Sequence, residues 1–179
     1  MTRVYNGTTA TTILPKVVGL KGLDKMTNLS QSYLSKDVLG TGQSSLVVDS
    51  SFIVNDGNEG NDYLVTLITA SGTIKPAILT MTATTDSKVY DGTTFSSAAP
   101  TAAGLFGTDT VTDLTQSYTS KNVLGEGKSV LVVNSTYMIH DGNSSKNYTV
   151  RKIAAYGTIT PAISTIAAAL DTEIMVSAL

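Results

Sequence analysis

The sequence predicts a mostly β protein made of two tandem small β modules in an elongated arrangement. Residues that favour strands and turns, namely Thr, Val, Tyr and Gly, are abundant, and Trp is absent. Asn-Gly and Asp-Gly pairs, which are strong turn signals, recur along the chain. No stretch shows clean helical periodicity. Hydrophobic residues make up 41% of the 179 residues, which is enough for a packed core.

Composition also excludes several classes of protein. The formal net charge of −2 provides no basic stripe for nucleic acid. The longest apolar stretch, residues 166–170, is too short to span a membrane. The absence of Cys excludes disulfides, Cys-ligated zinc and thiol catalysis. We therefore expect no nucleic-acid partner, no membrane insertion and no cofactor. No signal peptide is visible at Met1, so the chain is either intracellular or a fragment of a longer exported protein.

An internal repeat organises the chain. The stretch Val4–Thr9 recurs as Val89–Thr94, an offset of 85 residues. The same offset aligns the rest of the chain without a gap, with roughly half of the positions identical. We interpret this as a duplicated module, and each copy is large enough to have its own core. The predicted domains are residues 1–79, residues 80–165, and residues 166–179 as a tail or a truncated start of a further repeat.

Each module is predicted to consist of strands joined by polar turns. Alternating or β-branched residues place the strands of the second module at 82–90, 111–118, 129–139, 148–155 and 157–160. Turns rich in Gly and Asx fill the intervals, and residues 96–103 are ambiguous between loop and strand. Pro161 ends the last strand and should stiffen the link that follows.

The predicted core consists of the apolar positions that recur in both modules. Burying one such side chain stabilises a fold by roughly 1.5–3 kcal/mol. The positions, each with a counterpart 85 residues earlier, are Tyr90, Leu105, Leu114, Tyr118, Val123, Leu131, Val133, Tyr148, Val150 and Ile159.

An ordered series of motifs resembles a known family. The motifs are Lys-Val-Tyr-Asp-Gly-Thr-Thr at 88–94, Lys-Asn-Val-Leu-Gly-Glu-Gly-Lys at 121–128, Asn-Tyr-Thr at 147–149 and Gly-Thr-Ile-Thr-Pro-Ala at 157–162. Together they resemble the YDG (Tyr-Asp-Gly) repeat domain of bacterial surface adhesins and filamentous-haemagglutinin-like exoproteins, in two copies. The resemblance implies an exported bacterial module, β-grasp-like or sandwich-like, without catalytic residues.

Few residues suggest catalysis. The acids matched in both modules, Asp24/Asp109 and Asp56/Asp141, lie in turns near Gly, where Asp is common for backbone reasons. The single His, His140, has Asn55 at the matching position of the first module, so a Ser-His-Asp site would be absent there. We predict that the protein is not an enzyme.

Two further kinds of site are weaker candidates. Asp56, Asn58 and Asp62 could ligate calcium, but their spacing differs from an EF-hand and the second module loses two of the acids in this loop. Asn-X-Ser/Thr sequences offer glycosylation sites, although so many Ser and Thr residues produce some by chance. They lie at Asn6, Asn28, Asn134, Asn143 and Asn147.

These observations predict stalk or spacer repeats of a bacterial cell-surface adhesin, extracellular and presenting a distal binding region. The expected partners are neighbouring repeats of the same chain, and the expected state is a monomer, although open sheet edges could pair between chains. The alternative is an adhesive module that binds a glycan or host protein, with or without calcium. An exposed aromatic platform would favour this alternative, and the available aromatics are Phe95, Phe106, Tyr137 and Tyr156.

Overall fold

The computed structural model describes residues 1–168, which form fifteen β-strands and no helix. The predicted β class is confirmed. Among these residues, no helix is long and apolar enough to cross a membrane. A β-grasp fold packs its sheet against a helix, so the β-grasp alternative is wrong for this part of the chain. Most of the predicted tail, from residue 169 onward, lies outside the described residues.

The first half of the chain, residues 1–75, contains a four-stranded sheet. Its six strands are β1 (Thr2–Val4), β2 (Lys25–Thr27), β3 (Gln31–Tyr33), β4 (Ser44–Val48), β5 (Ile53–Asn55) and β6 (Ala70–Lys75). The sheet has the order β1-β6-β4-β3, in which β1 and β6 are parallel and the other neighbours are antiparallel. Strands β2 and β5 form a separate antiparallel pair.

The second half, residues 77–160, repeats these pairings. Its strands are β7 (Ala77–Thr82), β8 (Ser87–Val89), β9 (Thr101–Ala103), β10 (Thr110–Thr112), β11 (Gln116–Tyr118), β12 (Ser129–Val133), β13 (Met138–His140), β14 (Tyr148–Ile153) and β15 (Ala155–Thr160). The sheet β8-β15-β12-β11 has the order and strand directions of β1-β6-β4-β3, and β10 pairs with β13 as β2 pairs with β5. The 85-residue offset in sequence is therefore also an offset in backbone pairing.

A three-stranded sheet, β14-β7-β9, is found in the second half alone among the described residues. Strand β7 lies between β14, to which it is parallel, and β9, to which it is antiparallel. The positions 85 residues before β14 and β9 are residues 63–68 and 16–18, and neither segment is assigned as a strand. The two halves thus share one sheet and differ in the other.

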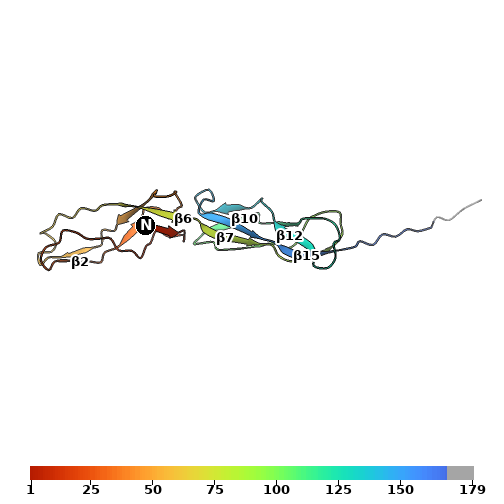
Figure 1. The fold of residues 1–179 in the computed structure, drawn as a ribbon, viewed down its shortest axis with the longest axis horizontal. Coiled ribbons are helices and arrows are strands. Elements are labelled where there is room, and N and C mark those ends of the chain that lie inside the picture. Colours follow the sequence, from red (N-terminus) through yellow and green to blue (C-terminus); the bar gives the residue numbers. More distant parts are fainter. Residues whose placement is uncertain (169–179) are drawn as a thin grey trace, which may run out of the picture.

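The chain passes from the first half to the second through a single residue. Pro76 separates β6 from β7, so the last strand of one half leads directly into the first strand of the next (Figure 1). Proline has no N–H and cannot continue a ladder, and the pairing partner changes at this point from β1 to β14. The predicted boundary between residues 79 and 80 falls inside β7.

Several predicted strands are shorter than expected. The predicted strand at 111–118 is broken into β10 and β11 at Asp113, which has a φ of 55°. The predicted strand at 129–139 is likewise divided into β12 and β13. The lead-in predicted at 82–90 contains only the three residues of β8, because the longer strand lies before it as β7.

The buried core contains most of the predicted residues but differs at both ends of the second half. Tyr118, Leu131 and Ile159 are buried together with their counterparts in the first half. Tyr90 and Val123 are instead 37% and 41% exposed, which corrects the prediction for these two positions. The core also contains four side chains from β7 and its end that were not predicted. They are Ala77, Leu79, Met81 and Ala83.

Candidate functional site

A buried polar cluster joins the two halves of the chain. The Tyr5 hydroxyl of the first half donates to Asp109 Oδ2 of the second half at 2.8 Å, and the Tyr148 hydroxyl donates to the same oxygen at 2.7 Å. The backbone N–H of Phe106 donates to the Tyr148 hydroxyl at 2.9 Å. Lys36 Nζ donates to the Tyr5 hydroxyl at 3.0 Å and lies 3.6 Å from Asp109 Oδ1.

The protonation of this cluster suits a fixed contact. Burial raises the pKa of Tyr5 and Tyr148, and the Asp109 carboxylate raises both further. The hydrogen bond to Tyr5 raises the pKa of Lys36. Both phenols therefore keep their protons at neutral pH and donate to one carboxylate, whose charge is offset by the nearby ammonium group.

Aromatic contacts surround the same hydroxyl groups. The Tyr5 ring meets the Phe106 ring edge to face, with centroids 6.2 Å apart, and the Tyr148 ring at 5.4 Å. A Cβ placed on Gly7 would lie 3.2 Å from the Phe106 side chain, and Gly7 has a φ of 76°. The Asn-Gly turn after Tyr5 therefore lets the backbone approach the second half closely.

A second group of hydrogen bonds joins the halves beside this cluster. Asn147, which is completely buried, donates from Nδ2 to Asp37 Oδ1 at 3.0 Å and accepts the Val38 N–H at Oδ1 at 2.9 Å. Asn143 Nδ2 donates to the Val38 carbonyl at 3.1 Å. The amide side chain at 147 is needed here because it donates to a carboxylate and accepts from a backbone amide at once.

The carboxylates proposed as calcium ligands hold their own loops instead. Asp56 accepts the backbone N–H groups of Asn58, Gly60 and Asp62, and Asn58 also donates to the Asp62 side chain. These backbone bonds lower the pKa of Asp56. Within residues 1–168, no three carboxylate or imidazole groups gather closely enough to hold a metal ion.

The matching loop of the second half is built in the same way. Asp141 accepts the N–H groups of Asn143, Ser145 and Asn147. Burial acts to raise the pKa of Asp141, but these backbone donors outweigh it and lower the pKa. The predicted backbone role for the Asp in these turns agrees with this geometry.

The five candidate glycosylation sites differ in access. Asn147 is closed to a modifying enzyme in the folded chain because it is completely buried. Asn143 and Asn134 are half-buried, and their side-chain amides donate to Val38 and Thr115. These two contacts would have to break on modification. Asn6 and Asn28 lie on the surface.

His140 and the aromatic candidates do not form one site. His140 is exposed and its Nε2 lies 3.0 Å from the Thr112 hydroxyl. Phe95 lies at a shallow hollow of about 400 Å³, together with Leu114 and Asn134. Phe106 instead contacts Tyr5 at the junction between the halves.

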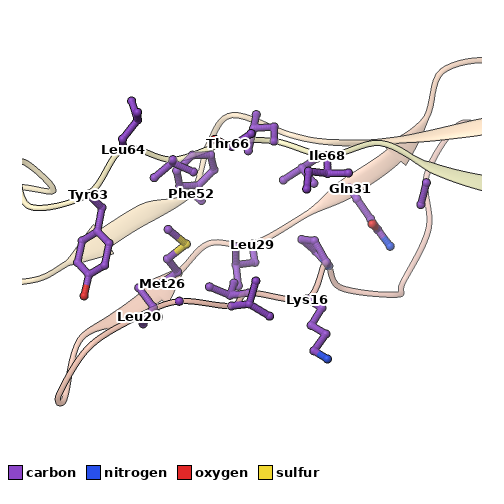
Figure 2. A pocket seen from close by; sticks show the side chains of 18 residues that line it. Lys16, Leu20, Met26, Leu29, Gln31, Phe52, Tyr63, Leu64, Thr66 and Ile68 are labelled. Atoms are coloured by element: carbon purple, nitrogen blue, oxygen red, sulfur yellow. The ribbon is translucent and has the colours of Figure 1, made fainter.

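The first half has an open apolar groove of about 410 Å³. Its walls are residues 15–20 and 63–68, the segments that match β9 and β14 but are not strands. Figure 2 shows Phe52 and Ile68 on one side of the groove and Met26 and Leu29 on the other. Sequence reasoning missed this groove, although it placed Leu29 in the core.

Comparison with known proteins identifies a YDG domain at residues 75–156. The match starts just before β7 and ends within β15, so the family unit includes the strand that fills the second half. The family's defining Tyr-Asp-Gly is Tyr90-Asp91-Gly92 in this domain. No curated protein and no solved structure gave a match to the chain.

Proposed function

We propose that the chain is a spacer segment of a bacterial cell-surface adhesin, formed by two tandem YDG modules that hold a distal binding region away from the cell. The first half is the first module, and the second half is the YDG domain. The placement at the cell surface rests on the resemblance to adhesin repeats. The mechanical role rests on the way the two halves are joined.

The observation that carries the proposal is the absence of a flexible linker. Strands β6 and β7, with Pro76 between them, make thirteen consecutive residues of extended chain, about 40 Å at 3.3 Å per residue. A proline joint has little freedom because φ is fixed and the preceding residue is restricted to extended backbone. Bending between the halves would therefore require a break in strand pairing rather than rotation of a loop.

The side-chain contacts at the junction support the same role. Tyr5 is almost fully buried against Asp109 and Tyr148, although it belongs to the other half. A hydrogen bond to a charged group contributes about 1.5–3 kcal/mol when it is well formed. Separating the halves would break this bond and those of Asn147, so the joint resists bending as well as stretching.

The arrangement of the strands along the longest axis in Figure 1 supports a spacer as well. The β2 end lies at one extreme, and the strands of the second half follow toward the other. Low charge density and many Ser and Thr residues give a polar surface without strong fields, which suits a segment that carries other parts.

The proposal is tested by distances between spin labels in the two halves. The chain has no Cys, so Ser50→Cys and Glu126→Cys, both at exposed positions, label one site in each half. A stiff spacer gives a single narrow distance distribution by electron paramagnetic resonance. The matched control carries a Gly-Ser linker inserted between Lys75 and Pro76, which should broaden the distribution. Equal breadth in the two proteins would contradict the proposal.

The alternative function, an adhesive module that binds a glycan, is favoured by the hollow beside Phe95. This ring is 66% exposed, and Ser96, Gln116 and Asn134 line the same hollow with polar groups. Stacking of a sugar on an exposed ring is a common mode of recognition. A glycan array with hits that Phe95→Ala removes would support this function, and an array without hits would exclude it in favour of the spacer.

A further inference from the structure

The groove in the first half corresponds to a place that is filled in the second half. There, β7 lies between β9 and β14, and its side chains Leu79 and Met81 are completely buried. Leu105, Leu114 and Tyr137 pack against the core that these two side chains belong to. Their counterparts 85 residues earlier, Leu20, Leu29 and Phe52, line the open groove. The groove is thus shaped for a strand like β7.

The chain carries a second segment with the pattern of β7. Residues 162–167 read Ala-Ile-Ser-Thr-Ile-Ala and follow Pro161, just as Ala-Ile-Leu-Thr-Met-Thr at 77–82 follows Pro76. Residues 161–168 are exposed throughout and form no strand. Both isoleucines, Ile163 and Ile166, are 97% exposed, which leaves apolar surface without a partner.

The polar groups of the internal junction are also repeated at the two free ends. Tyr90, the counterpart of Tyr5, is partly exposed at the end of the second half. Asp24 and Tyr63, the counterparts of Asp109 and Tyr148, already bond to each other at 2.6 Å in the first half, and Lys21 N–H donates to the Tyr63 hydroxyl. The acceptor for an incoming tyrosine is therefore assembled and lacks only its donor.

One pair of substitutions shows that the two ends match each other. At the internal junction, Asp37 accepts from Asn147. The counterparts at the free ends are Asn122 and Asp62, so the amide and the carboxylate have exchanged places. Asn122 can donate to Asp62, whereas Asp37 opposite Asp62 would place two carboxylates together. The exchange keeps one donor and one acceptor across a contact between ends.

We propose that copies of this chain associate head to tail, with residues 162–167 of one copy inserted as a strand into the groove of the next. The pairing of β7 with β14 sets the register, which places Ile163 beside Leu64 and Ile166 beside Leu67. Tyr90 of the first copy then donates to Asp24 of the second. Such a contact joins unlike surfaces, so it does not close on itself and extends into a linear chain of molecules.

This inference goes beyond the proposed function, because a spacer with free ends needs no contact with other copies. It also replaces the expectation of a monomer. Ser164 stands at the position of Leu79, the deepest residue of β7, so the natural segment leaves part of the groove unfilled. The association should therefore be reversible, and it should tighten when this position becomes apolar.

Sedimentation velocity of the whole chain over a range of concentrations tests the association. The natural chain should form a concentration-dependent series of oligomers, and Ser164→Leu should lower the dissociation constant about tenfold or more. Ile166→Lys should abolish the oligomers because it places a charge at the buried position of Met81. Ile163→Lys is the matched control, since its counterpart Ile78 stays exposed in the filled sheet.

Cross-linking tests the register. The chain has no Cys, so a short thiol cross-linker applied to Leu64→Cys with Ile163→Cys should give a ladder of covalent oligomers. Leu124→Cys with Ile163→Cys is the control and should give none. A protein that stays monomeric as Ser164→Leu, oligomers that survive Ile166→Lys, or a ladder from the control pair would each overturn the proposal. A link formed within one molecule would do the same, because it would assign the groove to the chain's own segment.

Discussion

The two halves of the chain have the same main sheet but only one of them has its second sheet filled. Residues 148–153 form β14 in the second half because β7 pairs with them. Residues 63–68 have the matching sequence positions in the first half, yet they form no strand and line a groove. The difference teaches that the strand state of this segment depends on its neighbour rather than on its own residues.

Removing the side chain that fills the second half should have the largest effect on this comparison. Leu79→Ala leaves a cavity under β7 and should cost about 2–5 kcal/mol of unfolding free energy. Leu64→Ala, at a 99% exposed position of the first half, should change it by less than about 0.5 kcal/mol. Urea unfolding followed by circular dichroism measures both, and similar losses would show that β7 is not what distinguishes the halves.

The next largest effect should come from the carboxylate at the junction. Asp109→Ala leaves the phenols of Tyr5 and Tyr148 buried without an acceptor, at a cost of about 1–3 kcal/mol each. Asp24→Ala removes the acceptor of one half-buried phenol, Tyr63, and should cost less than about 1 kcal/mol. Unfolding midpoints in urea compare the two variants. An Asp24 loss as large as that of Asp109 would contradict the assignment of the junction.

Alkaline pH should open the junction before it affects the rest of the fold. Burial raises the folded-state pKa of Tyr5 and Tyr148, so folding favours the protonated phenols. This contribution to stability is complete below the ordinary phenol pKa of about 10 and is lost as pH rises through the folded-state pKa. Phenolate absorbance and circular dichroism should change together above this pH. In Tyr5→Phe the dependence should be weaker, and an unchanged dependence would refute the link.

The smallest effect should come from exchanging the residues that distinguish the two Tyr-Asx-Gly turns. Asp91 accepts from Lys88 at 2.8 Å, which lowers the pKa of Asp91 to about 2, and Asn6 accepts from Arg3 at the matching place. Both side chains also accept the N–H two residues later. Asn6→Asp and Asp91→Asn should therefore leave the melting temperature nearly unchanged. A marked loss in either would show that charge, and not turn conformation, is required.

Much of this fold could be predicted from the sequence, since the 85-residue offset and the β class follow from composition and alignment. Strand β7 was missed because Pro76 was taken to end one module, although residues 77, 79, 81 and 83 alternate as a buried strand does. The alternation was a usable signal. It was assigned to a linker because no pairing partner for it is visible in a single sequence.

The exposed counterparts of buried residues were beyond sequence reasoning for a different reason. Tyr5 and Tyr90 are identical in type and context, but only Tyr5 has a second half next to it. Burial at these positions depends on a neighbour and not on the residue itself. The exchange of Asp37 and Asn147 for Asn122 and Asp62 is visible in the alignment, yet it gains meaning only when the first pair is seen to touch.

Amide hydrogen exchange tests the central claim most directly, namely that a β7-like strand completes the first half as it does the second. In the dilute chain, residues 148–153 should be protected and residues 63–68 should exchange quickly. Adding a peptide with the sequence of residues 76–83 should protect residues 63–68 and leave the protection of 148–153 unchanged. Equal protection of the two segments without peptide, or no gain of protection at 63–68 with it, would contradict the account.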